Sequence, residues 1–76
     1  MPQTATSRVF RNKVGTILKN NRKYAGLSQR ALGKQIGVSH NFIGDAERGS
    51  KLPSLIVALK LMKFFNLSAK ALIDCM

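Results

Sequence analysis

The chain has 76 residues, and its 13 lysines and arginines against three acidic residues give a net charge of +10 and a pI of about 10.8. This charge indicates a polyanionic partner, because neutralising phosphates releases counterions, although charge alone does not choose between DNA, RNA and an anionic lipid surface. The length allows one domain with a small core, no apolar run approaches the roughly 20 residues of a membrane span, and MPQTATSR lacks the apolar region of a secretory signal.

The N-terminal part of the sequence divides into a short arm and a first helix. Residues 1–7 lack hydrophobic periodicity and are expected to form a flexible arm, whereas residues 8–76 are expected to form one domain. The first helix is predicted from Ser7 to about Tyr24, with one face formed by Phe10, Val14, Ile17 and Leu18. We interpret Gly15 as a weak point within this helix.

Two short helices joined by a tight turn are predicted next, over about residues 29–36 and 40–48. Each begins with a serine that can cap the helix and with apolar residues at the spacing of a hydrophobic staple: Leu27, Ser28 and Leu32, then Val38, Ser39 and Ile43. Gly37 is expected to end the first of these helices, because glycine takes a positive φ without a Cβ penalty. The arrangement is a helix-turn-helix.

A fourth helix is predicted from about Ser54 to Phe65, and it carries two apolar rows. The row that we assign to the core contains Leu55, Ala58, Leu59, Met62 and Phe65. The second row contains Val57, Leu61 and Phe64, and one small domain can hardly cover both rows. We therefore expect the second row either under a short fifth helix, predicted from Leu67-Ser68 to Ile73 or Asp74, or in a dimer interface.

The sequence offers little catalytic chemistry. His40 has no second histidine, cysteine or acid at metal-ligand spacing, and Cys75 stands alone near the C-terminus, where we interpret it as an ordinary cytosolic thiol. No carboxylate pair, glycine-rich phosphate loop or nucleophile–base set is present. We therefore expect neither an enzyme nor a bound metal or cofactor.

The order of these features resembles the helix-turn-helix domains of the lambda-repressor and Cro (XRE) class. The resemblance covers about residues 8–74 and rests on Gly26-Leu27-Ser28-Gln29, Gly37-Val38-Ser39, Ile43, Glu47-Arg48-Gly49, Leu52-Pro53-Ser54-Leu55 and Asn66-Leu67-Ser68. It implies an all-α bundle of about five short helices. Two glycines depart from the pattern: Gly33 stands where alanine is common, and Gly44 lies within the recognition helix, where glycine costs roughly 0.5–1 kcal/mol relative to alanine.

The resemblance also implies roles for three residues. A glutamine at the start of the second helix, here Gln29, binds a DNA phosphate with the help of the helix dipole. An arginine of the first helix, here Arg22, pairs with the glutamate that is Glu47 in this chain. A partly buried Glu47 would need such a partner, and two independent surface charges are the alternative.

The third helix is expected to enter the major groove with its N-terminal residues toward the base edges. The residues expected to contact bases are His40, Asn41, Phe42 and Asp45, with partial burial as the alternative for Phe42. Asn41 matches adenine, His40 can donate to guanine, and Asp45 either accepts from cytosine or excludes wrong sites. The residues expected to contact the DNA backbone are Gln29, Arg30, Lys34, Ser39, Arg48, Ser50 and Lys51.

These observations predict a sequence-specific DNA-binding transcriptional regulator of the prokaryotic cytosol or nucleoid. A regulator without an effector domain acts by occupying a promoter, so we expect a repressor, similar to phage repressors or restriction-modification controllers. It would bind a palindromic operator in double-stranded DNA as a homodimer, through Val57, Leu61 and Phe64. The alternative is an antitoxin-like protein whose fourth helix binds a partner protein. A membrane or RNA binder is disfavoured, because three capped helix starts specify a packed bundle.

Overall fold

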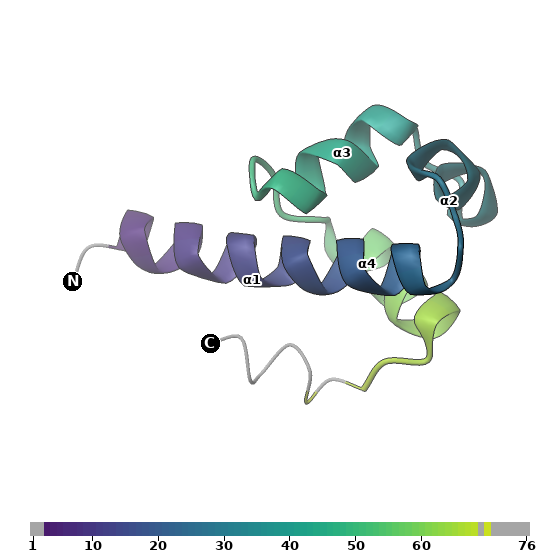
Figure 1. The fold of residues 1–76 in the computed structure, drawn as a ribbon. Helices are drawn as coiled ribbons and strands as arrows, with labels where there is room; N and C mark the ends of the chain where they lie inside the picture. The colour runs from purple at the N-terminus through teal and green to yellow at the C-terminus, as the bar shows by residue number, and fades with distance from the viewer. Residues whose placement is uncertain (1–2, 69, 71–76) are drawn as a thin grey trace.

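The computed structural model describes residues 3–68 and 70, which contain four α-helices and no strand: α1 (Gln3–Tyr24), α2 (Gln29–Ile36), α3 (His40–Arg48) and α4 (Leu55–Phe65) (Figure 1). The all-α class predicted from the sequence is confirmed. Both helices of the helix-turn-helix have the predicted bounds, and α1 begins four residues before the predicted start. The predicted fifth helix lies mostly outside the described residues, and the division into an arm (1–7) and a domain (8–76) stays a prediction.

Serine hydroxyls cap the N-termini of three helices. Each hydroxyl accepts a hydrogen bond from the backbone N–H three residues later, over 3.0–3.3 Å, at Ser28, Ser39 and Ser54. These bonds satisfy N–H groups that have no partner within the helix. The same three helices end at residues with a positive φ: Gly37, Gly49 and Asn66. Local signals at both ends therefore define α2, α3 and α4.

The core lies where α1 and the helix-turn-helix meet, and α4 packs against α2 (Figure 1). It contains Leu18, Leu32, Ile36, Ile43, Ala46 and Leu61. Leu32 of α2 and Ile43 of α3 are fully buried, and both belong to the hydrophobic staples predicted from the sequence. The contact between α2 and α3 at these two side chains fixes the position of α3 relative to the rest of the domain.

Two glycines allow backbone segments to approach each other closely. A Cβ atom on Gly15 would lie 2.5 Å from the carbonyl oxygens of Ala46 and Glu47, and a Cβ on Gly33 would lie 2.5 Å from that of Val38. Side chains do not tolerate such distances, so α1 crosses the end of α3 only because residue 15 is glycine. The interpretation of Gly15 as a weak point was therefore wrong.

The predicted orientation of α4 was wrong for several of its residues. Leu61, which we assigned to a dimer interface, is 7% exposed and belongs to the core, and Val57 packs against that core. Leu55, which we assigned to the core, is 76% exposed, and Leu59 is exposed as well. Each predicted row is split between the two sides, because Phe65 of the first row packs against the core and Phe64 of the second row is exposed. Both rows are apolar, and only contact with the other helices decides which residues turn inward.

The outward side of α4 is consequently rich in apolar side chains. We call its exposed apolar residues, Leu55, Ile56, Leu59 and Phe64, the outer face of α4; the exposed Lys60 and Lys63 lie between them on the helix surface. Phe64 also packs edge-on against Phe65, with ring centroids 5.1 Å apart. None of the described helices combines the length and the apolar character that a bilayer crossing requires.

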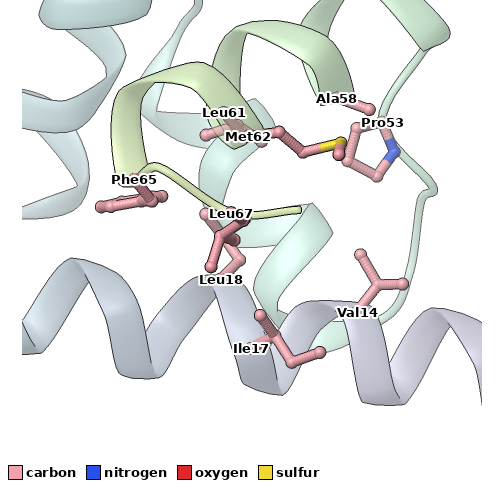
Figure 2. Close-up of a pocket in the computed structure, with 9 residues that line it drawn as sticks. All are labelled: Val14, Ile17, Leu18, Pro53, Ala58, Leu61, Met62, Phe65 and Leu67. Carbon is pink, nitrogen blue, oxygen red and sulfur yellow. The ribbon is translucent and has the colours of Figure 1, made fainter. Parts of the chain in front are cut away.

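An apolar pocket separates part of α1 from α4 (Figure 2). Its lining is formed by Val14, Ile17, Leu18, Pro53, Ala58, Leu61, Met62, Phe65 and Leu67. Figure 2 shows the side chains of α1 and those of α4 facing each other across this pocket. Ala58, Met62 and Phe65, which we assigned to the core, are half-buried along it. The pocket is almost wholly apolar and therefore lacks the polar groups that would orient a polar ligand.

Candidate nucleic-acid interface

The first turn of α3 presents polar side chains to the solvent. Ser39, His40 and Asn41 are exposed, and the hydroxyl of Ser39 accepts from the backbone N–H of Phe42. Behind this turn, Ile43 is fully buried in the core. The turn is therefore held rigidly from behind while its outward side chains stay accessible to a partner.

Phe42 and Asp45 differ from their exposed neighbours because both are half-buried. For Phe42 this agrees with the partial burial that we gave as the alternative to a base contact. Ser39 already serves as a cap, and a cap hydroxyl keeps a second lone pair for a further donor. Of the residues predicted to read bases, His40 and Asn41 are the most accessible.

Arg22 and Glu47 form an ion pair that joins α1 to α3. Arg22 Nε donates to Glu47 Oε2 over 2.5 Å, and Arg22 Nη2 donates to Glu47 Oε1 over 3.1 Å. Arg22 Nη1 donates to the carbonyl of Leu27 over 2.8 Å. The side chains of Arg22 and Glu47 are 10% and 3% exposed, respectively. The structure thus contains the pair that the family resemblance implies, in a bidentate and buried form.

The protonation of this pair follows from its surroundings. Burial by itself raises the pKa of Glu47, but hydrogen bonds from Arg22 and Gln29 and the charge of Arg22 outweigh it, so the pKa of Glu47 is lowered. The hydrogen bond to Glu47 raises the pKa of Arg22 against the opposing effect of burial. Both groups are therefore charged near neutral pH.

Gln29 takes part in the same network. Its Nε2 donates to Glu47 Oε1 over 3.1 Å, so the side chain predicted to bind a phosphate is held against the end of α3. Gly44 lies beneath it: a Cβ there would be 3.3 Å from Gln29 Oε1 and 3.1 Å from Arg48 Nη1. Gly44 is buried, whereas we expected it to face outward with Asp45.

Asp45 lies between two of the cations predicted to bind the DNA backbone. Arg48 Nη2 binds Asp45 Oδ1, and Lys51 Nζ lies 3.8 Å from Asp45 Oδ2. The side chains of Arg48 and Lys51 are 64% and 66% exposed. The structure thus brings a predicted base-reading residue together with two predicted phosphate-binding residues, an association that helical spacing alone suggests only for Asp45 and Arg48.

The remaining predicted backbone contacts are accessible. Arg30 and Lys34 of α2 and Ser50 after α3 are exposed. One contributor to this region was missed by the sequence reasoning: Arg11 Nε donates to the carbonyl of Gly49 over 2.9 Å and ties the end of α3 to α1. No sequence pattern identifies this contact, because it depends on the close crossing of the helices at Gly15.

Comparisons with known proteins agree with this geometry. The sequence profile of the HTH_3 helix-turn-helix family matches residues 18–72. The uncharacterized HTH-type transcriptional regulator YgzD of Bacillus subtilis is 39% identical over 58 residues, which cover 76% of this chain and 82% of YgzD. The ImmF control region 10 kDa protein of Bacillus phage phi105 is 32% identical over 60 residues, which cover 79% of this chain and 67% of that protein.

One solved structure is similar to this chain over almost the entire length of the solved protein. The crystal structure of the restriction-modification controller protein C.AhdI from Aeromonas hydrophila matches with a TM-score of 0.73 and 32% identity, over 82% of this chain and 94% of the controller. The exposed first turn of α3, the capped helices and these similarities lead to one conclusion: the chain belongs to the HTH_3 (XRE-type) helix-turn-helix family of DNA-binding transcriptional regulators.

Proposed function

We propose that the protein is a repressor that binds a palindromic operator in double-stranded DNA as a homodimer, in the prokaryotic cytosol or nucleoid. The observation that carries the proposal is the first turn of α3, where His40 and Asn41 are exposed while Ile43 anchors the helix in the core. An α-helix held in this way fits the major groove with its N-terminal residues toward base edges. Similarity to a phage control-region protein and to a restriction-modification controller supports a role at promoters.

Base reading is assigned to the outward residues of α3. Asn41 offers a donor and an acceptor side by side, which match adenine N6 and N7, and His40 can donate to guanine N7 or O6. Phe42 is assigned to packing, because its side chain is half-buried. The residues assigned to the DNA backbone surround this turn: Gln29, Arg30, Lys34, Ser39, Arg48, Ser50 and Lys51.

The dimer is assigned to the outer face of α4. Of the residues that the sequence predicted for the interface, Phe64 keeps this assignment, whereas Leu61 and Val57 contact the core of their own chain. Exposed Leu55, Ile56 and Leu59 supply the apolar area that a stable dimer buries. A two-fold dimer would present two copies of α3 about 34 Å apart, which is one turn of DNA.

Selection from random duplex DNA tests the whole proposal. Full-length protein is incubated with a pool of random duplexes, and the bound fraction is amplified and sequenced through several rounds. Enrichment of an inverted repeat with half-sites about one helical turn apart is the expected result. A pool that remains random after repeated rounds would contradict sequence-specific binding.

A second candidate rests on the same outer face of α4. An antitoxin-like regulator would use these exposed apolar residues to bind a different protein instead of a second copy of itself. The protein is purified from its native host, where the proteins encoded by the neighbouring genes are also made, and the mass of the purified species is measured by light scattering. This measurement separates the two possibilities. A stable complex of fixed stoichiometry with another protein favours the antitoxin-like function, and a homodimer favours the repressor.

A further inference from the structure

Asp45 is an acidic residue at the surface of a strongly basic domain. Within the described residues the only other acid is Glu47, whose carboxylate is enclosed by Arg22. Both oxygens of Asp45 face cations, since Arg48 binds Oδ1 and the ammonium group of Lys51 lies 3.8 Å from Oδ2. Two exposed cations next to the recognition helix are therefore associated with a carboxylate of their own chain.

We propose that Asp45 takes the place of a DNA phosphate on Arg48 and Lys51 in the free protein, and thereby weakens binding to DNA of arbitrary sequence. This inference rests on the proposed function. Guanidinium and ammonium groups bind carboxylates and phosphates with the same donors, so the DNA backbone competes with Asp45 for them. While the carboxylate stays paired, Asp45, Arg48 and Lys51 together present a net charge of one to the DNA, instead of the two of Arg48 and Lys51 alone. Binding therefore releases fewer counterions.

The local shape of α3 favours this internal pairing. Arg48 follows Asp45 by three residues, so the two side chains lie on neighbouring positions of the helix surface. The guanidinium also passes close to Gly44, where a Cβ would be 3.1 Å from Nη1. A pair this exposed is weak, so DNA can break it, and Asp45 modulates binding without preventing it.

Breaking the pair makes the effect dependent on DNA sequence. A released carboxylate is repelled by phosphates, but in the major groove it can accept a hydrogen bond from the N4 amino group of cytosine. Asp45 follows Asn41 by four residues and therefore lies on the same face of α3, one turn further from the N-terminus. An operator with cytosine at that position compensates for the broken pair, and other sequences do not.

The substitution Asp45→Asn tests this inference, because it keeps the shape and removes the charge. Affinity for a pool of random-sequence duplexes is measured by fluorescence anisotropy over a series of KCl concentrations. We expect the affinity to rise about fivefold per protomer near physiological salt, and the slope of log K against log salt to steepen by about 0.9 per protomer. Affinity for the operator found by selection should rise less, so that the ratio of specific to random binding falls. An unchanged or lower affinity for random duplexes would overturn the inference.

Two controls separate the pairing from a general effect of charge. Asn20→Lys adds the same single charge at an exposed position of α1, on the side opposite to the buried Leu18 and Arg22. Its effect on random-duplex affinity should be clearly smaller than that of Asp45→Asn, and an equal effect would contradict the inference. In a background with Arg48→Ala and Lys51→Ala, the gain from Asp45→Asn should shrink, because only the repulsion between the carboxylate and the phosphates is then left to remove. A gain as large as in the wild-type background would contradict the inference.

A further comparison tests the coupling between the two residues. Arg48→Ala should reduce random-duplex affinity more in the Asp45→Asn background than in the wild-type background, because the guanidinium is fully available to phosphates only when the carboxylate is gone. Equal losses in the two backgrounds would contradict the inference. Wild-type protein that shows neither salt-dependent binding nor enrichment in the selection would refute the proposed function itself. If the wild-type protein binds DNA and Asp45→Asn binds random duplexes with unchanged affinity, only the proposed role of Asp45 is refuted.

Discussion

Glu47 is the residue at which three helices of the domain meet. It belongs to α3, and its carboxylate accepts hydrogen bonds from Arg22 of α1 and Gln29 of α2. Arg22 in turn donates to the carbonyl of Leu27, at the entry to α2. One buried carboxylate therefore links the helix-turn-helix to the helix that supports it.

Loss of this carboxylate should be costly. We expect Glu47→Ala to lower the free energy of unfolding by about 3–5 kcal/mol, because the substitution leaves the guanidinium of Arg22 buried without its partner. Urea denaturation of Glu47→Ala, Arg22→Ala and the double mutant measures the effect. The double mutant should be less destabilised than the sum of the single mutants, whereas additive losses of about 1 kcal/mol or less would indicate two unrelated charges.

The residues proposed to contact DNA should affect binding without affecting the fold. Asn41→Ala should cost about 1–3 kcal/mol on the best operator and relax the preference at one base pair in each half-site. Lys34→Ala, which removes a predicted phosphate contact, should weaken binding to all sequences alike. Competition assays with single-base operator variants test both expectations. Equal losses on operator and random DNA for Asn41→Ala would identify Asn41 as a backbone contact.

At the scale of the helices, the crossing of α1 and α3 depends on Gly15. A Cβ on Gly15 meets backbone carbonyls that cannot move aside, so Gly15→Ala should destabilise the domain by about 1–3 kcal/mol despite the better helix propensity of alanine. Gly44→Ala is the matched control. There the new Cβ meets only the ends of the flexible Gln29 and Arg48 side chains. Thermal melts that rank Gly44→Ala below Gly15→Ala in stability would contradict this explanation.

The two sides of α4 should respond differently to the same substitution. Leu59→Lys places a charge on the exposed outer face and should give a folded monomer with weakened operator binding. Leu61→Lys places the charge in the core and should unfold the domain. Circular dichroism and analytical ultracentrifugation distinguish these outcomes. A Leu59→Lys variant that still sediments as a dimer would place the interface elsewhere, for example around Cys75 and Met76.

The elements that sequence predicts well are those whose signals are local. The serine caps, the glycine turn and the staples of α2 and α3 act within a few residues, and the predicted bounds of both helices agree with the structure. The rotation of α4 was not predictable, because leucines occupy both of its sides and only tertiary packing distinguishes Leu55 from Leu61. The need for glycine at position 15 likewise appears only when α1 and α3 are brought together.

At the scale of the whole molecule, the number of phosphates that the dimer neutralises sets the dependence of binding on salt. In each protomer, four cations are assigned to the DNA backbone: Arg30, Lys34, Arg48 and Lys51. A dimer therefore has eight of these cations. Their net charge is six if each Asp45 carboxylate remains paired with its cations. The slope of log K against log salt should therefore lie between about −5 and −7. Filter binding or anisotropy over a KCl series measures it, and a slope near −1 would exclude this footprint.

The anchoring of α3 from behind has a consequence for how such a regulator can acquire new targets. His40 and Asn41 lie on the solvent side of a turn whose geometry is set by the Ser39 cap and by Ile43, so neither residue is needed to hold the helix in place. If these two residues read bases as proposed, substitutions there can explore new operators at little cost in stability. A combinatorial library at positions 40 and 41 should consist mainly of folded variants, and the domain is well suited to retargeting by evolution or by design.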